Sequence, residues 1–217
     1  MSIIKRIEQM AKERKASYKG GTTQKYEFWE NISILAAQVG MPPFDSYKED
    51  FDMSLNLGGR YSKKVLHLDM PLVVAAMSYG AISRSAKLAI HDALNELSKE
   101  GIKLALNTGE GGALPEELYK HEYNLIVQYA SGRFGVNIDY LKKADAIEIK
   151  LGQGAKVGLG GHLLEDKITE DIAKQRQIPE GVSAFSPARH MDIIGPEDLD
   201  AKVSELREIT DWEKPIL

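Results

Sequence analysis

The stretch from Pro71 to Gly101, PLVVAAMSYGAISRSAKLAIHDALNELSKEG, decides the fold class. It opens with a continuous apolar run, as expected of a strand that is buried on both faces in a parallel sheet. Apolar residues then recur at helical spacing, at Ala86, Ile90, Ala93, Leu94 and Leu97, until Gly101 stops the pattern. The stretch therefore predicts a strand followed by an amphipathic helix.

The same alternation continues to the last residue. Further strands are predicted in IKLALNTGEGG (102–112), LIVQYASGRFGV (125–136) and AIEIKL (146–151), and KPIL (214–217) resembles the start of another. Helices are predicted in DYLKKA (139–144), TEDIAKQRQI (169–178) and PEDLDAKVSELREI (196–209), with Thr169 as N-cap and Pro196 in the first turn. Strands that alternate with helices indicate βαβ units and a parallel sheet, either open or closed into a barrel.

The glycine-rich and polar clusters favour the barrel. We place each of them at the C-terminal end of a strand: MSYGAIS, NTGEGG, QYASGRFG, GQGAKVGLGG and SPARHMD. In a (β/α) barrel the ligand-binding residues gather at the C-terminal ends of the strands. A dinucleotide-binding fold would instead carry GxGxxG after its first strand, and MSYGAIS does not match it.

The densest glycine cluster, residues 152–161, surrounds a single lysine, Lys156, and is closed by His162. Glycine loses the most entropy on ordering, so this composition needs a compensating reason. Either the backbone approaches a ligand closely and offers its N–H groups to an anion, or the segment is a wide turn between a strand and a helix. The residues of this segment alone leave both readings open.

Composition excludes several classes of function. The hydrophobic content of 43%, the charged content of 28% and the net charge of −4 are those of an ordinary globular protein without a basic surface for nucleic acid. No apolar run approaches the roughly 20 residues of a membrane span, so we expect no membrane partner. The chain has no cysteine, which excludes disulfides and thiolate ligands for zinc or an iron–sulfur cluster.

Two domains are predicted: a mostly helical or irregular leader over residues 1–68, and a barrel-type region over 69–217. The N-terminal MSIIKRIEQMAKERK is charged and lacks the apolar core of a signal peptide, so we expect a cytoplasmic protein. Within the leader, LNLGGRYSKKVLHL (55–68) predicts an irregular or hairpin stretch with Gly58 and Gly59 at its turn.

Taken together, the clusters resemble the FMN-binding synthase domain of the glutamate synthase large subunit. The matching elements are AAMSYGAISRSA, NTGEGG, QYASGRFGVNIDYL, EIKLGQGAK, GGHL, DIAKQR and SPARHMDIIGPEDL, in the order of the family. The resemblance runs from about Leu68 to Leu217, and more loosely back to about Val39. It implies a (β/α)8 flavin barrel that reduces 2-iminoglutarate, formed from 2-oxoglutarate and ammonia, to L-glutamate with FMN.

The resemblance also implies roles for individual residues. Lys156 matches the family lysine beside flavin and substrate, and Glu110 a glutamate at the mouth of the active site that handles ammonia or protons. Arg176 matches the arginine that holds a substrate carboxylate, a task suited to a planar guanidinium. His162 is a second candidate substrate ligand. The remaining candidates are Met77 and Ser78 against the flavin, Ser78 also near the substrate, and Gln128 and Lys150 at the isoalloxazine edge; Arg133 is equally compatible with a structural role.

His162 stands where bacterial and plastid members have glutamine, and Leu159 where they have glutamate. The GLGGHL version resembles a shorter, archaeal-type branch of glutamate synthase-like proteins that includes N-methylglutamate synthase subunits, so ammonia and methylamine both remain possible. Without cysteine the chain offers neither a glutaminase nucleophile nor iron–sulfur ligands. We therefore expect glutaminase and electron-donor subunits or domains on other chains.

Residues 69–217 are too few for eight βα units, which take about 200 residues or more. We expect the N-terminal half of a barrel, with the FMN phosphate site outside this chain. We also expect self-association or a complementing half-barrel. Two other functions stay open: a non-catalytic half-barrel that binds a partner, and a barrel without flavin that binds a phosphorylated metabolite.

Overall fold

The computed structural model describes residues 12, 31–33, 39–40, 42–45, 47–154 and 160–217. The chain divides into two compact units. One comprises residues 1–52 with 154–157, and the other comprises residues 53–153 with 158–217. All helices and strands discussed below belong to the second unit. The segment 55–68 thus belongs to the same unit as the predicted barrel region.

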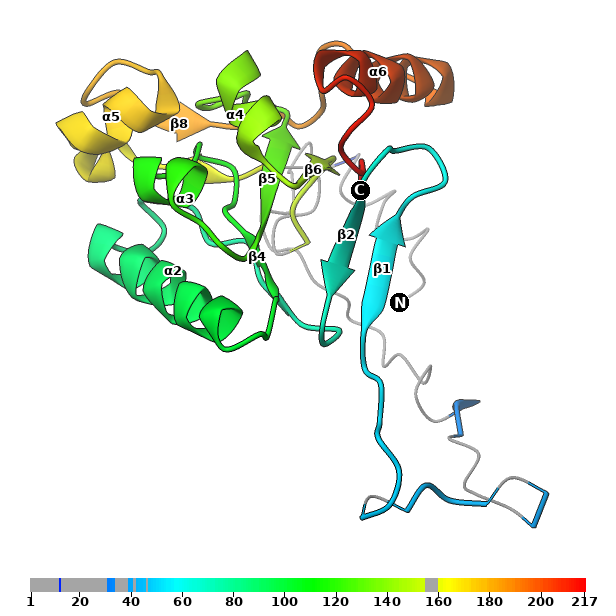
Figure 1. Cartoon of the computed structure of the whole chain (residues 1–217). Coiled ribbons are helices and arrows are strands. Elements are labelled where there is room, and N and C mark those ends of the chain that lie inside the picture. Colours follow the sequence, from blue (N-terminus) through cyan, green and yellow to red (C-terminus); the bar gives the residue numbers. More distant parts are fainter. Residues whose placement is uncertain (1–11, 13–30, 34–38, 41, 46, 155–159) are drawn as a thin grey trace. The chain divides into compact units, whose positions relative to one another are not determined.

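A parallel sheet organises the second unit (Figure 1). Its strands lie side by side in chain order: β3 (Val73–Val74), β4 (Ala105–Asn107), β5 (Asn124–Ala130) and β6 (Ala146–Lys150). Beyond β6, the residues 215–217 continue the sheet, since Ile147 and Ile216 form a parallel bridge and Ile149 N–H donates to the Leu217 carbonyl at 2.9 Å. The prediction that KPIL begins a strand is therefore confirmed.

Helices alternate with the strands along the chain, and the first three connect β3 to β4, β4 to β5 and β5 to β6. The helices are α2 (Arg84–Lys99), α3 (Pro115–Tyr119), α4 (Ile138–Lys143), α5 (Glu170–Arg176) and α6 (Pro196–Ile209). The Ser83 and Asn137 side chains cap α2 and α4 by accepting from the Ala86 and Tyr140 N–H groups. Thr169 occupies the N-cap position of α5 without a side-chain bond, and Pro196 starts α6 as expected.

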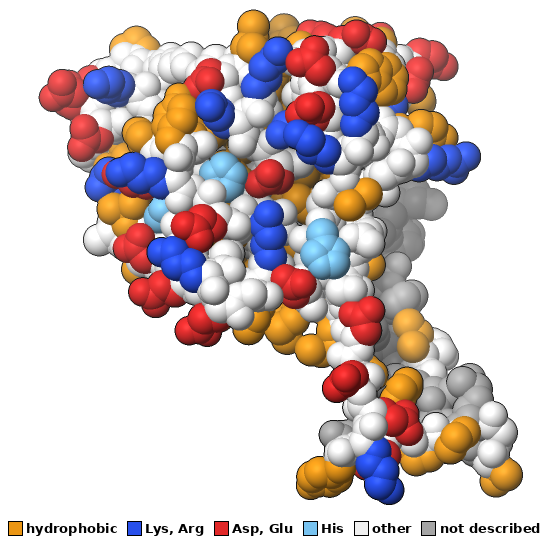
Figure 2. All heavy atoms as spheres, viewed as in Figure 1, with side chains coloured by type: hydrophobic (Ala, Val, Ile, Leu, Met, Phe, Trp, Pro, Cys, Tyr) orange, Lys and Arg blue, Asp and Glu red, His pale blue; other side chains and the backbone are white. Residues whose placement is uncertain are grey.

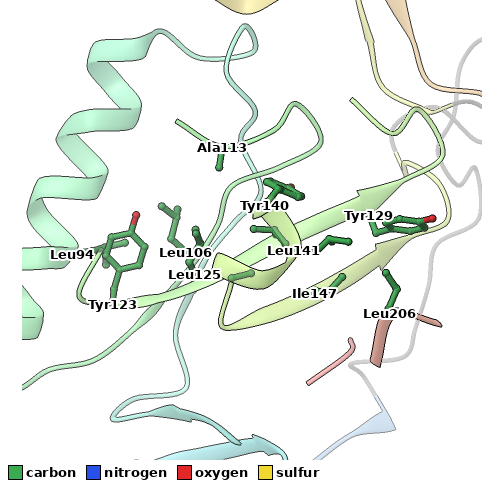
Figure 3. Close-up of a cluster of buried hydrophobic side chains, with 12 residues drawn as sticks. Leu94, Leu106, Ala113, Tyr123, Leu125, Tyr129, Tyr140, Leu141, Ile147 and Leu206 are labelled. Carbon is green, nitrogen blue, oxygen red and sulfur yellow. The ribbon is translucent and has the colours of Figure 1, made fainter. Parts of the chain in front are cut away.

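One face of the sheet is covered by the helices (Figure 3). Strand β5 is buried along its whole length, and Leu125, Val127 and Tyr129 point to this face. The helices contribute apolar side chains, among them Leu94 of α2, Leu141 of α4 and Leu206 of α6. Full burial on both faces explains why β5 is apolar at every position except Asn124 and Gln128.

The opposite face of the sheet is covered at its lower end by an antiparallel hairpin of β1 (Leu55–Gly58) and β2 (Val65–Leu68) (Figure 1). Leu66 and Leu68 pack there against Ala105, Ile126 and Ala146. The hairpin predicted for 55–68 is therefore confirmed.

The fold class is α/β with a four-stranded parallel sheet, and closure into a barrel stays a prediction. Four short elements lie outside the helix and strand ranges predicted above: α3, the 3-10 turn η2 (Glu165–Lys167), and the antiparallel pair of β7 (His162–Leu163) and β8 (Ala184–Phe185). Over the described ranges no helix combines the length and apolarity needed to cross a membrane. In Figure 2, basic and acidic side chains are interspersed over the visible face.

Candidate functional site

Polar side chains replace apolar ones toward the C-terminal ends of the strands, on the face opposite the helices. Ile126 and Ala146 are paired in register near the hairpin, and the next pair on this face is Gln128 and Glu148. Gln128 is only 5% exposed, and its amide donates to Glu148 at 2.6 Å. Lys150 ends β6 one step further along the same face. The face thus passes from an apolar floor to a layer of polar groups.

Glu110 is the centre of the first cluster at these strand ends. Its Oε2 atom accepts from Lys150 Nζ at 3.1 Å and from Ser186 Oγ at 3.0 Å. These contacts join the loops after β4 and β8 to the last residue of β6. A Cβ atom at Gly161 would collide with the Glu110 carboxyl group, so this glycine is required for close approach. At Gly161, therefore, the group that approaches the backbone closely is the Glu110 side chain and not a ligand.

Arg176 forms the second cluster, with Ser78. Its Nη2 atom donates to Ser78 Oγ at 3.3 Å and to the Tyr79 carbonyl at 3.1 Å. Arg176 is 4% exposed, and its buried Nε has no hydrogen-bond partner. Burial lowers the pKa of the Arg176 guanidinium, an effect that the Glu110 charge opposes. Both hydrogen-bond acceptors of this guanidinium are uncharged, and its Cζ atom lies 5.5 Å from the centroid of the Phe134 ring.

Backbone contacts fix where Arg176 lies. Gly112 and Gly135 both have positive φ angles, 74° and 68°, and a Cβ at Gly135 would lie 2.8 Å from Gly112 Cα and 2.6 Å from the Gln175 carbonyl oxygen. The Gly135 N–H donates to the Arg176 carbonyl at 3.0 Å. The loops after β4 and β5 therefore meet the end of α5 with no side chain between them.

A buried ion pair lies beneath the loops after β3 and β4. Lys87 Nζ is 2.9 Å from Glu117 Oε1, and the two side chains are 3% and 0% exposed. The ammonium group also donates to the carbonyls of Met77 and Thr108, both at 3.1 Å. Burial lowers the pKa of Lys87, and the charge of Glu117 opposes this shift. Because Met77 precedes Ser78, this pair anchors the backbone beside the Arg176 cluster.

Arg133 has a structural set of contacts. It donates to Ala130 O, to His190 Nδ1 at 2.8 Å and to Asp192 Oδ1 at 2.6 Å, and it lies 3.8 Å from the centroid of the Tyr129 ring. A guanidinium can only donate, so His190 accepts at Nδ1 and carries its proton on Nε2, which donates to the Lys150 carbonyl at 2.7 Å. The network ties the loop after β8 to the ends of β5 and β6.

The candidate residues thus fall into separate groups. The structure joins Ser78 to Arg176, and Glu110 to Lys150, whereas Gln128 contacts Glu148. His162 lies on β7 with an exposed ring, 5.7 Å from that of Phe185. Met77 offers its carbonyl to Lys87. Lys156 and Leu159 lie outside the described residues, so the predictions for them stay predictions.

Sequence reasoning missed Ser186 and Lys87 as members of these clusters. Ser186 begins the SPARHMD motif, which was recognised as a cluster but not residue by residue. Lys87 lies at helical spacing from the apolar residues Ile90 and Leu94 of α2, and a lysine aligned with such a stripe is a usable signal of a buried charge. Within the ranges that the structure describes, His, Asp and Glu side chains form no cluster suited to a metal ion.

Comparison with known proteins assigns the family. Residues 3–217 match the model of the conserved region in glutamate synthase. The chain is 42% identical over 196 residues to a glutamate synthase large subunit-like protein of Rhizobium meliloti, covering 90% of this chain and 43% of the relative. It is 41% identical over 214 residues to the archaeal glutamate synthase [NADPH] of Methanocaldococcus jannaschii, covering 87% and 41%. It is also similar to the glutamate synthase [NADH] of Schizosaccharomyces pombe, with 37% identity over 163 residues that cover 73% of this chain and 8% of the relative. The chain spans about 40% of the length of the first two relatives, and it belongs to the glutamate synthase family.

Proposed function

We propose that this chain supplies the keto-acid-binding part of a glutamate synthase-type oxidoreductase, which converts 2-oxoglutarate and ammonia to L-glutamate through 2-iminoglutarate. The observation that carries the proposal is the Arg176 guanidinium, which is 4% exposed and has an unpartnered Nε atom. Buried charges in proteins are as a rule paired or coordinated. A substrate carboxylate would supply the missing counter-charge in bidentate geometry.

Ser78 would complete the carboxylate site. Its Oγ atom lies 3.3 Å from Arg176 Nη2, and the Lys87 ammonium holds the preceding carbonyl of Met77. A hydroxyl group can donate to a carboxylate while it accepts from the guanidinium. The proposal therefore assigns Arg176 and Ser78 to one end of the dicarboxylate. His162 remains our candidate for the other end.

Glu110 suits the handling of ammonia. It accepts from both an ammonium group and a hydroxyl group, so the role that fits it is that of a carboxylate receiving a proton. Ammonium must lose a proton before its nitrogen can attack the keto carbon. We propose that Glu110 takes up that proton, with Lys150 and Ser186 holding its carboxylate in position. For Lys156 we keep the proposed role of a positive charge beside the substrate.

The donor and acceptor groups on the polar face fit FMN. The Gln128 amide donates to Glu148 and leaves its own carbonyl oxygen to accept from a ring N–H, while Lys150 is a cation at the strand end. Gln128 and Lys150 would hold the edge of the ring system, and Met77 and Ser78 would lie against its face. When bound, FMN supplies the hydride that reduces the imine. Electron donor and glutaminase would be other subunits or domains.

Calorimetric titration of the chain with 2-oxoglutarate, in the presence of FMN, tests the carboxylate site. A hydrogen bond to a charged group contributes about 1.5–3 kcal/mol. Arg176→Gln should therefore weaken keto-acid binding by roughly one to two orders of magnitude, at about 1.4 kcal/mol per decade. The flavin absorbance that co-elutes with the protein should not change.

Arg84→Gln is the matched control. Arg84 is an exposed arginine in a surface pair with Glu116, and its loss should leave keto-acid binding unaffected. Equal weakening by both variants would point to a general charge effect. Unchanged binding in Arg176→Gln, or loss of the flavin with the keto-acid, would remove Arg176 from the substrate site.

We also propose that another chain or chain segment completes the sheet. At the β3 edge, Leu72 and Val73 are 52% and 46% exposed. Proteins usually pair the free backbone groups of such an edge strand with another strand, or cover its apolar side chains. Light scattering after size-exclusion chromatography should then give a dimer or larger assembly, or a complex with a complementing half-barrel. A stable monomer with no tendency to associate would contradict this proposal.

A further inference from the structure

A second charged region lies at the opposite ends of the strands. A cavity of about 480 Å³ is bordered there by the first residue of β5, Asn124, and by Asp145, which precedes β6. Strand β5 runs over seven residues, at about 3.3 Å per residue, so roughly 20 Å of strand separate this cavity from the polar layer near Lys150. Its charged lining is one aspartate and four lysines: Lys63, Lys64, Lys103 and Lys214.

The carboxylate that lines the cavity is already engaged. Asp145 Oδ2 accepts from His121 Nε2 at 3.2 Å and from the Leu125 N–H at 2.8 Å. Although burial opposes the change, these bonds and the charge of Lys214 lower the pKa of Asp145. Asp145 is therefore ionised and held in place, with its bonds directed to the sheet.

The neighbouring carboxylates are engaged as well. Glu213 bonds Lys64 at 2.8 Å, and Asp69 accepts from the Lys103 backbone N–H. Within the described part of the chain, the ammonium groups of Lys63, Lys103 and Lys214 have no hydrogen-bond or ion-pair partner. The charges of Lys63 and Lys214 act on Glu213, that of Lys103 on Asp69 and that of Lys214 on Asp145. Four lysines thus face three carboxylates, which leaves the cavity a small excess of positive charge in a protein whose net charge is −4.

Backbone bonds hold these three lysines on different segments. The Lys63 N–H donates to the Trp212 carbonyl at 2.7 Å, and the Lys103 carbonyl accepts from the Asp69 N–H at 3.0 Å. Lys214 is followed by Pro215, whose carbonyl accepts from the Ile147 N–H of β6 at 3.0 Å. In Figure 2, basic side chains lie among acidic ones over the part of the surface where Figure 1 shows β2 and the C-terminus. Fixed backbones reduce the ordering cost of binding.

We propose that this cavity binds the phosphate group of a small phosphorylated molecule. Lysine ammonium groups bind phosphate as point charges, and a dianionic phosphate matches several of them better than a single carboxylate does. A volume of about 480 Å³ lies in the range of small-molecule sites. Its position at the N-terminal ends of the strands separates it from the proposed keto-acid site, so the ligand is a second one.

Calorimetry with inorganic phosphate, pyrophosphate and adenosine monophosphate as probes tests the proposal, at about 0.15 M salt, where the Debye length is about 8 Å. We expect one saturable site per chain, and the double variant Lys63→Gln/Lys103→Gln should weaken binding at least tenfold. Tighter binding of the monophosphate than of inorganic phosphate would identify a phosphorylated metabolite as the ligand. The reverse order would identify the free anion.

The matched control is Lys99→Gln/Lys120→Gln, which removes the same charge from exposed lysines that do not line the cavity. Equal weakening in the control, or the absence of saturable binding for all three probes, would overturn the proposal. Arg176→Gln should leave phosphate binding intact. The test therefore succeeds or fails independently of the keto-acid site.

Discussion

Two buried cations, Lys87 and Arg176, lie close to the same strand ends and differ in how their charge is met. Lys87 is 3% exposed and Arg176 4%. The lysine contacts the Glu117 carboxylate at 2.9 Å and donates to two backbone carbonyls. The arginine donates to a hydroxyl group and a carbonyl and keeps a buried, unpartnered Nε. The first is a complete ion pair, and the second lacks a counter-ion among its contacts.

The difference separates a structural role from a binding role. A buried charge whose counter-ion belongs to the same fold has a structural role, because its removal leaves the buried counter-ion unpaired. A charge without a partner is tolerated where a ligand completes it. His91 shows a third way to avoid an unpaired buried charge. It lies one turn from Lys87 on α2 and is 4% exposed, and its ring can be neutral. Each prediction below tests one side of this contrast.

The largest effect is expected for Lys87→Met. The substitution leaves the fully buried Glu117 carboxylate without its cation, which typically costs about 3–5 kcal/mol. Urea unfolding followed by circular dichroism measures the loss. The double variant Lys87→Met/Glu117→Gln should recover a large part of it. A loss below about 1 kcal/mol in the single variant would show that the pair is not the compensated charge described here.

The next effect concerns Glu110, the carboxylate whose charge acts on Arg176. Gly161→Ala places a methyl group against the Glu110 carboxyl, and overpacking of this kind costs about 1–3 kcal/mol. Gly152→Ala is the control, because a Cβ at Gly152 meets nothing within 4 Å. Thermal unfolding should show a lower midpoint for Gly161→Ala alone. Equal midpoints would mean that Glu110 is not held at Gly161.

A smaller stability change is expected for Arg176→Gln. The variant loses two hydrogen bonds but no longer buries a charge, so the free energy of unfolding should stay within about 1 kcal/mol of the original value. Chemical denaturation of this variant beside Lys87→Met compares the two cations directly. If Arg176→Gln proves as destabilising as Lys87→Met, the distinction between the two sites disappears.

The smallest effect is a pH dependence from His91. Burial lowers its pKa, which the charges of Asp92, Glu117 and Glu116 oppose and His121 reinforces. Folding therefore favours the neutral ring, whose stabilisation is complete above the unfolded pKa of about 6.5 and is lost as the pH falls below it. Denaturation at a series of pH values should show this loss. His91→Gln should reduce it, and an unchanged pH profile would exclude His91 as its source.

Sequence patterns predicted the elements with strong periodicity. Helix α2 and the fully buried strand β5 follow directly from their apolar spacing, and the hairpin turn follows from Gly58 and Gly59. Patterns of two to five residues carry too little signal, which is why α3 and the pair β7–β8 were missed. In α3 the first turn is stabilised by Glu117, whose carboxylate accepts from the Leu114 N–H at 2.7 Å.

The candidate site was predicted by motif, and its internal contacts were not. Arg176 and Glu110 were singled out because they match family motifs, yet no spacing rule relates Glu110 to Ser186, which lies 76 positions further along the chain. Such contacts depend on which strand ends become neighbours in the sheet. For the same reason the lysine cavity could not be predicted from the sequence, because its lining residues come from the hairpin turn, the residues before β4 and the last segment.

The contact between Gly112 and Gly135 has a consequence for how this protein can vary. A Cβ at Gly135 would lie 2.6 Å from the Gln175 carbonyl oxygen, a Cβ at Gly112 would lie 3.0 Å from the same oxygen, and both glycines have positive φ angles. A side chain added at either position would meet main-chain atoms, so a smaller residue at the other position could not make room for it. Random mutagenesis with selection for keto-acid binding should therefore recover no pair of compensating changes at these two sites. The position of Arg176 is set by the main chain, beyond the reach of side-chain repacking.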